Sequence, residues 1–129
     1  SDDDAYDVTY TLANTLVNAG VLVGLENSGD MERMNARNLP FLAGTCAAFG
    51  LDKEKALSLI TLNTAKILGI DDKVGSLEVG KDATFFISEG DALDMRTNKL
   101  SKAYMQGRDI SLESHQTELY KRYSNKYKQ

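Results

Sequence analysis

The sequence predicts an α/β protein in which a helical part with a buried strand is followed by a small β unit and a closing helix. Two observations carry this prediction. Up to residue 69, helical periodicity surrounds one short apolar run, residues 21–25. A helix, a glycine, a buried strand and a polar loop, in this order, are typical of an α/β barrel or a doubly wound sheet. After Gly69 the apolar period changes and turn residues become frequent, which indicates short strands.

The first helix is predicted over about residues 5–19, and Gly20 suits the position just past its end. Its apolar side chains recur at helical spacing: Leu12, Ala13, Leu16 and Val17. Residues 21–25 form a continuous apolar run. A strand that is covered on both faces shows no polar alternation, so we expect this run to be a buried parallel strand.

Two further helices are expected after the polar loop 26–38. Pro40 suits the first turn of a helix that closes at Gly50, and Asp52 suits the N-cap of the next. That second helix is predicted to continue to Gly69, with a buried stripe of Ala56, Leu57, Ile60, Thr64, Ile67 and Leu68. Cys46 lies in a run of small residues, which predicts a buried packing role.

The β unit is expected to contain strands at 74–80 and 83–87 and a hairpin over 103–110 that turns at Gln106–Gly107. A final helix is predicted over about residues 112–127. One side of it carries Leu112, Gln116, Leu119, Tyr123 and Tyr127, and basic residues near its end complement the helix dipole.

The composition fits one folded domain rather than a disordered chain, with 129 residues, 42% hydrophobic and 26% charged. The net charge of −4 argues against a nucleic-acid partner, because such proteins usually carry a basic patch. The single cysteine allows no internal disulfide, and no apolar run has the length of a membrane span. We therefore expect a soluble protein that binds no nucleic acid and has no membrane span.

Three motifs, in order, cover most of the chain. The first extends from Gly50 to Gly69, the second is Val74–Phe86 and the third is Tyr104–Arg108. The residues that characterise the first motif are Ala56, Leu57, Thr61, Asn63, Ala65, Leu68 and Gly69. Together they resemble the C-terminal portion of the amidohydrolase superfamily, most closely its imidazolonepropionase-related bacterial members. The compartment stays open between bacterial cytoplasm and periplasm.

This resemblance implies a metal-dependent hydrolase on a (β/α)8 barrel. Residues 1–69 would be the last strand and helices of the barrel, residues 70–111 a small β-sandwich-type unit of the composite domain, and residues 112–129 a C-terminal helix. In such enzymes a divalent metal, most often zinc, lowers the pKa of a bound water. The resulting hydroxide attacks a non-peptide C–N bond, often of a cyclic amide.

The resemblance also implies where a site would lie. The last-strand Asp of the family falls on Asn27, and Glu26 or Asp30 could replace it if the loop shifts. Arg33 or Arg37, at the lip of the pocket, could bind an acidic substrate. The alternative is that this loop carries its charges into solvent.

No metal ligand is assigned in this chain, because one histidine, His115, cannot build a cage of three or four ligands. We expect His115 at the surface or in packing. Any metal would belong to an intact parent enzyme. Thr61 and Asn63 could aim polar groups at a loop, although ordinary hydrogen bonding near a helix end explains them equally.

Three interpretations remain open at this stage. The chain could be part of a hydrolase with a small-molecule substrate, whose other barrel strands precede residue 1 or lie on another chain. It could be a non-catalytic relative that serves as a binding or structural domain, for which Asn27 is the evidence. It could also be a stand-alone domain that only mimics the family. Because residues 21–25 would lack neighbouring strands, we expect either the N-terminal barrel portion or self-association to cover them.

Overall fold

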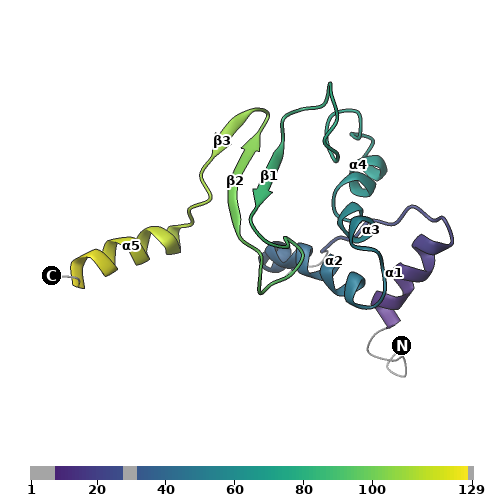
Figure 1. Cartoon of the computed structure of the whole chain (residues 1–129), viewed down its shortest axis with the longest axis horizontal. Helices are drawn as coiled ribbons and strands as arrows, with labels where there is room; N and C mark the ends of the chain where they lie inside the picture. The colour runs from purple at the N-terminus through teal and green to yellow at the C-terminus, as the bar shows by residue number, and fades with distance from the viewer. Residues whose placement is uncertain (1–7, 28–31, 128–129) are drawn as a thin grey trace.

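The computed structural model describes residues 8–27 and 32–127. In this part, four α-helices gather on one side of a three-stranded sheet, and a fifth α-helix projects away on the other side (Figure 1). In chain order the elements are α1 Val8–Asn18, the 3-10 helix η1 Glu32–Asn38, α2 Leu39–Ala48, α3 Lys53–Ser58, α4 Leu62–Leu68, β1 Phe85–Ser88, β2 Leu100–Met105, β3 Arg108–Ile110 and α5 His115–Tyr127. No helix in this described part is long and apolar enough to span a membrane.

Several predicted helix boundaries are confirmed. Pro40 lies in the first turn of α2. The side chain of Asp52 accepts a hydrogen bond of 3.2 Å from the backbone N–H of Lys55, so it caps α3. Gly69 ends α4 with φ of +74°, a left-handed conformation that favours glycine.

The prediction of one helix from residue 52 to 69 is wrong. The segment divides into α3 and α4, and Thr61 between them has φ −126° and ψ −94°. This break changes the helical phase, so residues beyond it do not continue the expected buried stripe. Ile67 and Leu68 are 55% and 65% exposed, whereas Leu59, outside that stripe, is fully buried.

The apolar run at residues 21–25 is also not a strand in this structure. Val21 and Leu22 are each 49% exposed. The backbone of the run is bound to the break between α3 and α4 instead: the N–H of Leu25 donates to the carbonyl of Leu59 at 3.0 Å. A parallel strand needs neighbours that share its ladder of hydrogen bonds. The described residues place no strand beside this run.

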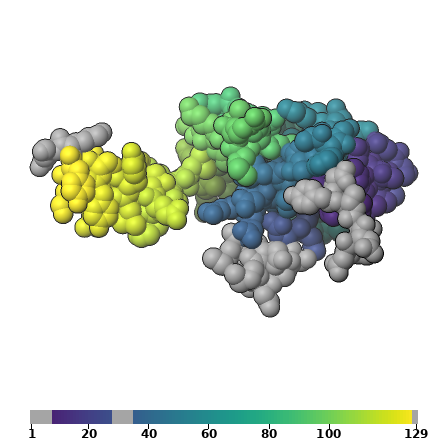
Figure 2. Space-filling model, turned by 90° about the horizontal axis from the view of Figure 1, so that it is seen from below, coloured from purple at the N-terminus to yellow at the C-terminus, as the bar shows by residue number. Residues whose placement is uncertain are grey.

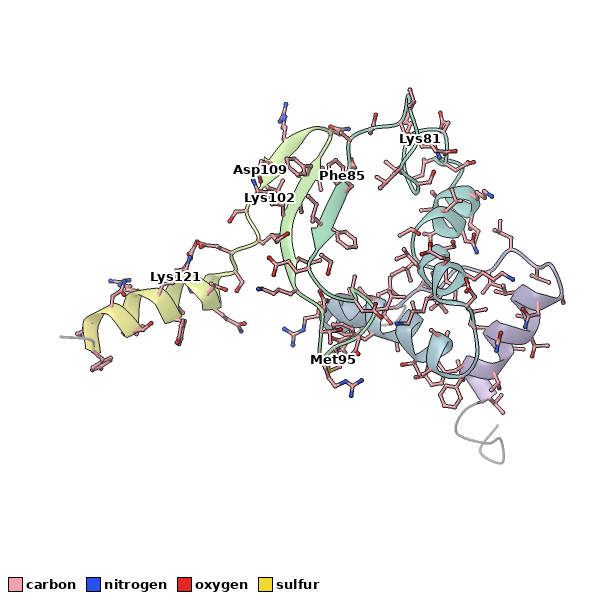
Figure 3. All side chains as sticks on the ribbon, viewed as in Figure 1. Lys81, Phe85, Met95, Lys102, Asp109 and Lys121 are labelled. Atoms are coloured by element: carbon pink, nitrogen blue, oxygen red, sulfur yellow. The ribbon has the colours of Figure 1, made fainter. Side chains whose placement is uncertain are left out.

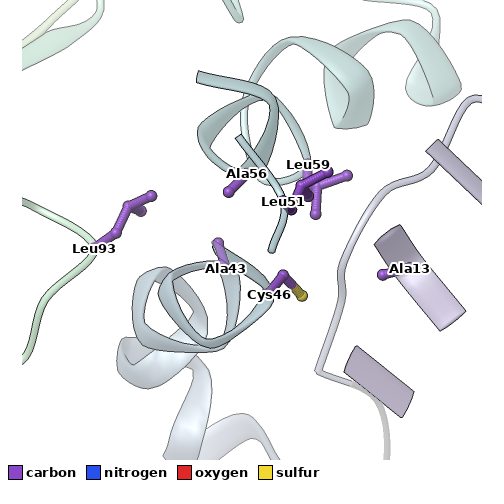
Figure 4. Packing of buried hydrophobic residues seen from close by; sticks show 7 residues of the cluster. All are labelled: Ala13, Ala43, Cys46, Leu51, Ala56, Leu59 and Leu93. Carbon is purple, nitrogen blue, oxygen red and sulfur yellow. The ribbon is translucent and has the colours of Figure 1, made fainter. Parts of the chain in front are cut away.

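The core lies where α1, α2, α3 and the loop after β1 meet (Figure 4). It consists of Ala13, Ala43, Cys46, Leu51, Ala56, Leu59 and Leu93. Cys46 is 1% exposed, which confirms its packing role, and burial raises the pKa of its thiol. A Cβ on Gly44 would lie 2.0 Å from the carbonyl oxygen of Leu93, so the loop can reach α2 only because residue 44 has no side chain.

The sheet has the order β1-β2-β3, and both pairings are antiparallel. The predicted hairpin is confirmed: Gln106 and Gly107 have φ of +51° and +79° at its tip. The predicted strand at residues 74–80 is wrong, because this segment forms turns. Lys81 holds them, with its Nζ 2.6 Å from both Ser76 Oγ and Glu78 Oε2 (Figure 3).

The final helix, α5, starts at His115 rather than near residue 112. None of its residues is buried. The expected apolar side of this helix therefore contacts no core.

Candidate functional site

The polar loop that follows residues 21–25 begins with Glu26 and Asn27. Glu26 is exposed, and Asn27 is half-buried. The Nδ2 of Asn27 donates to the backbone carbonyl of Asn35 in η1 at 3.3 Å. A carboxylate at this position could not donate that bond, because an ionised Asp is only an acceptor. The side chain of Asn27 therefore connects the segment before the loop to η1 after it by a hydrogen bond.

The other predicted site residues are brought together only in part. Asp30 lies outside the described residues. Arg33 and Arg37 both fall within η1, and Arg37 is exposed, with no ion pair to any residue that the structure describes. The structure thus brings Asn27 to the backbone of η1 and leaves the carboxylate of Glu26 at the surface.

The residues available do not fit a catalytic metal ion. Within residues 8–27 and 32–127, no three His, Cys, Asp or Glu side chains lie close enough together to hold one. His115 is on α5 with its side chain 82% exposed, and its nearest acidic neighbour is Glu118 at 3.9 Å. A divalent ion needs three or four converging ligands, so no catalytic step can be assigned to a metal on these side chains.

Polar residues of the first motif hold the site segment in place. Asn63 Nδ2 donates to the carbonyl of Val23 at 2.9 Å, so it reaches the neighbouring segment 21–27. Thr61 Oγ1 donates to the carbonyl of Leu57 at 2.8 Å, which is ordinary helix-end bonding. Thr64 was predicted only as a member of the buried stripe, and its hydroxyl donates to the carbonyl of Leu59 at 3.0 Å. Thr64 and the N–H of Leu25 thus share the same carbonyl acceptor.

A salt bridge connects the helical part to the loop that carries Leu93. Lys53 Nζ lies 2.6 Å from Asp91 Oδ2. The hydrogen bond from Lys53, followed by one from the N–H of Leu93, lowers the pKa of the Asp91 carboxyl. Sequence reasoning did not find this contact, because its partners are 38 positions apart.

A groove of about 680 Å³ lies between α3 and α4 on one side and β1 on the other. Apolar side chains dominate its lining, among them Leu62, Leu77 and Phe85. It also has no counterpart in the sequence-based predictions, since its walls come from three segments that only the fold brings together.

Comparison with known proteins identifies the family. The model of the amidohydrolase family matches residues 7–113. The chain belongs to the amidohydrolase family. This membership confirms the resemblance, so the likeness to these proteins is not mere mimicry.

Relatives of this amidohydrolase include imidazolonepropionases. That of Shewanella oneidensis is 62% identical and that of Shewanella sp. strain W3-18-1 is 60% identical, each over 40 residues. Each match covers 31% of this chain and about 10% of the length of the relative.

Solved structures agree with the α/β amidohydrolase fold. An amidohydrolase from Thermotoga maritima MSB8 is similar with a TM-score of 0.69 and 30% identity, covering 82% of this chain and 27% of that one. A second structure, of an uncharacterized protein, has a TM-score of 0.59 at 20% identity, and this similarity supports a shared fold only. This amidohydrolase chain thus spans about a quarter of its solved relatives.

Proposed function

We propose that this chain is the C-terminal part of a metal-dependent hydrolase that acts on non-peptide C–N bonds of the cyclic amide type, and that it is not catalytic alone. The observation that carries the proposal is the family match over residues 7–113, joined to 62% local identity with an imidazolonepropionase. Residues 1–69 would complete a barrel, residues 70–111 a β-sandwich-type unit, and residues 112–129 would add a helix.

Exposed apolar surface supports the view that other elements complete this fold. Val21 and Leu22 are half exposed, and Ile67 and Leu68 more than half. Such adjoining apolar residues are costly in water and mark surfaces that another element covers. In this proposal the N-terminal barrel portion covers residues 21–25, pairs them as a strand, and brings the ligands of the divalent metal, with zinc the first choice.

This chain would help to shape the pocket and to bind the substrate, rather than supply the metal ligands. Asn63 and Asn27 fix the two ends of the segment that leads into the loop, through bonds to Val23 and Asn35. The loop would then form one lip of the substrate pocket. An exposed arginine there, such as Arg37, would attract the carboxylate of an acidic substrate.

A second candidate function is a non-catalytic amidohydrolase relative that binds ligands or partners. Asn27 favours it, because an amide cannot act as a general base and is a weaker metal ligand than a carboxylate. The bond from Asn27 to the carbonyl of Asn35 shows the amide in a role that an Asp could not take over.

The test compares the 129-residue chain with the same chain joined to a barrel portion. Elemental analysis after dialysis measures zinc, iron and manganese, and an absorbance assay measures hydrolysis of an imidazolone. The proposal expects no stoichiometric metal on the chain alone, and both metal and hydrolysis in the joined protein. One equivalent of metal held by the chain alone would refute the first part.

Variants separate the two candidate functions in the joined protein. If Asn27→Asp creates hydrolysis where the unchanged protein has none, the amide itself blocks catalysis and the non-catalytic function is correct. Asn18→Asp is the matched control, since Asn18 is an exposed residue of α1 whose side-chain amide donates to Asn14 on the same helix. A joined protein that binds metal and hydrolyses the substrate with Asn27 unchanged excludes the non-catalytic alternative.

A further inference from the structure

The β unit and the helical part of the chain lie against each other, but their strands and helices do not pack directly. Figure 2 shows the green β unit beside the blue helices, with α5 as a separate lobe. Among the described residues, no strand packs against a helix. Contact with α2 and α3 comes instead from residues 89–99, the loop between β1 and β2, which we call the strap. The alignment of the two parts there depends on the strap.

The strap is a closed loop with a tight neck. At its two ends the N–H of Glu89 donates to the carbonyl of Lys99 at 2.9 Å, and the two side chains form a salt bridge of 2.6 Å. Next to them, a Cβ on Gly90 would lie 2.0 Å from the carbonyl oxygen of Thr97, so the two sides of the neck are in close contact. Because the neck is closed, the strap holds its tip at a fixed place relative to the sheet.

The tip of the strap is packed into the helical core. Leu93 is 8% exposed and shares the core with Ala43 of α2 and Ala56 of α3, which are fully buried (Figure 4). A leucine has room here because both helices offer only a methyl group. The carbonyl of Leu93 also lies against Gly44, where no Cβ would fit. The tip is thus fixed against the middle of α2.

One carboxylate connects this tip to α3. Asp91 Oδ1 accepts a hydrogen bond of 2.9 Å from the N–H of Leu93, and its Oδ2 lies 2.6 Å from Nζ of Lys53 at the start of α3. The first bond shapes the turn that presents Leu93, and the second attaches that turn to the helix. The bond from Lys53, followed by that from Leu93, lowers the pKa of Asp91, so the carboxylate is ionised and keeps both partners near neutral pH.

Helix α2 follows directly on η1, where predicted site residues lie. η1 ends at Asn38 and α2 begins at Leu39. The backbone of Asn38 is helical, with φ −90° and ψ −2°, so no loop separates the two helices. A shift of α2 therefore also moves η1. With η1 move the carbonyl of Asn35, which accepts the bond from Asn27, and the exposed side chain of Arg37.

We propose that the strap positions the lip of the substrate pocket, because it fixes α2 and α2 carries η1. The inference rests on the proposed function, since only there does η1 form a pocket lip. Asp91 and Leu93 are then positioning residues: they act through α2 and do not touch the substrate. If the strap instead only stabilised the core, its loss would loosen all of the helical part to the same extent.

Two side-chain amides of the 129-residue chain separate these possibilities. The amide of Asn27 is bonded to the carbonyl of Asn35 in η1, and the amide of Asn63 is bonded to the carbonyl of Val23. Both hold the same segment, but Asn63 belongs to α4, which packs on α3 and not on α2 within the described chain. The hydrogen exchange of both amides can be measured in one sample by heteronuclear NMR. Only the rate of Asn27 should respond to the strap.

Two variants release the strap at different points. Lys53→Met removes the charge that anchors it to α3. We expect the amide of Asn27 to exchange roughly two- to fivefold faster, as the loss of an exposed ion pair predicts, and the amide of Asn63 to keep its rate. Leu93→Ala empties the core at the tip of the strap and should accelerate Asn27 more strongly.

Two further variants are the controls. Lys53→Arg keeps the ion pair, and Asp94→Asn changes a carboxylate whose partner, Arg96, lies within the strap, so neither should alter the rate of Asn27. If Lys53→Met and Leu93→Ala accelerate both amides equally, the strap only stabilises the fold; if neither accelerates Asn27, η1 is positioned without the strap. Either result overturns the proposal. These rates do not depend on hydrolysis, so a joined protein that fails to hydrolyse the imidazolone would count against the proposed function and leave this inference standing.

Discussion

Leu59 is the side chain whose truncation should cost this protein most. It is fully buried, and with Cys46 it is among the largest side chains in the core that are completely covered. It comes from the break between α3 and α4, and its carbonyl accepts bonds from Leu25 and Thr64. A change at this position therefore loosens both the core and the attachment of the site segment.

The magnitude follows from burial. Leu59→Ala removes three carbon atoms, worth about 0.8 kcal/mol each in transfer free energy. The cavity that remains adds to this, so we expect a total loss of about 3–5 kcal/mol in unfolding free energy. Leu68→Ala removes the same atoms from a side chain that is 65% exposed, so its loss should stay below about 1 kcal/mol.

Urea unfolding followed by circular dichroism measures both variants. The midpoint of Leu59→Ala should fall strongly with little change in slope. A midpoint equal to that of the unchanged protein, or a larger loss in Leu68→Ala than in Leu59→Ala, would show that the buried face of this segment is assigned wrongly.

Three further outcomes are expected. Asp52→Ala should lower the unfolding free energy by about 0.5–2 kcal/mol in urea, while Asp52→Asn, which keeps an acceptor for the cap, should lose less. Gly44→Ala should cost about 1–3 kcal/mol, since its Cβ would meet the carbonyl of Leu93 at 2.0 Å; equal midpoints would mean that the loop does not pack on α2. The pKa of Asp91 is lowered mainly by Lys53, so the folded state binds the proton less readily than the unfolded state. This stability is present above the ordinary Asp pKa of about 3.9 and is lost as pH falls through the folded value. In Asp91→Asn the dependence of the urea midpoint on acidic pH should be weaker; an unchanged pH profile would contradict the role of the pair.

Local patterns in the sequence were sufficient for the features that depend on neighbouring residues. Asp52 caps α3, Pro40 lies in the first turn of α2, and Gln106–Gly107 forms the hairpin tip. Each of these is determined by the backbone preference or the side-chain bonding of a few adjacent residues. The family resemblance also came from such motifs and is confirmed by the match over residues 7–113.

The candidate site was predicted less completely. Asn27 was singled out from the sequence, but its partner, the carbonyl of Asn35, was not. Backbone carbonyls carry no sequence signal, so a bond of this kind is visible only once η1 is placed. The same holds for Asn63. The sequence left open whether its side chain binds a loop or only its own helix end, and the structure shows that it donates to the carbonyl of Val23.

By itself, then, the sequence determined the helix caps, the hairpin, the burial of Cys46 and the family. Only the tertiary structure decided the break at Thr61, the unpaired path of residues 21–25 and the groove beside β1. These features depend on contacts between segments far apart in the chain. Periodicity reports which faces are apolar, but the energy of covering a face depends on which neighbour is present, and that neighbour is fixed by the fold.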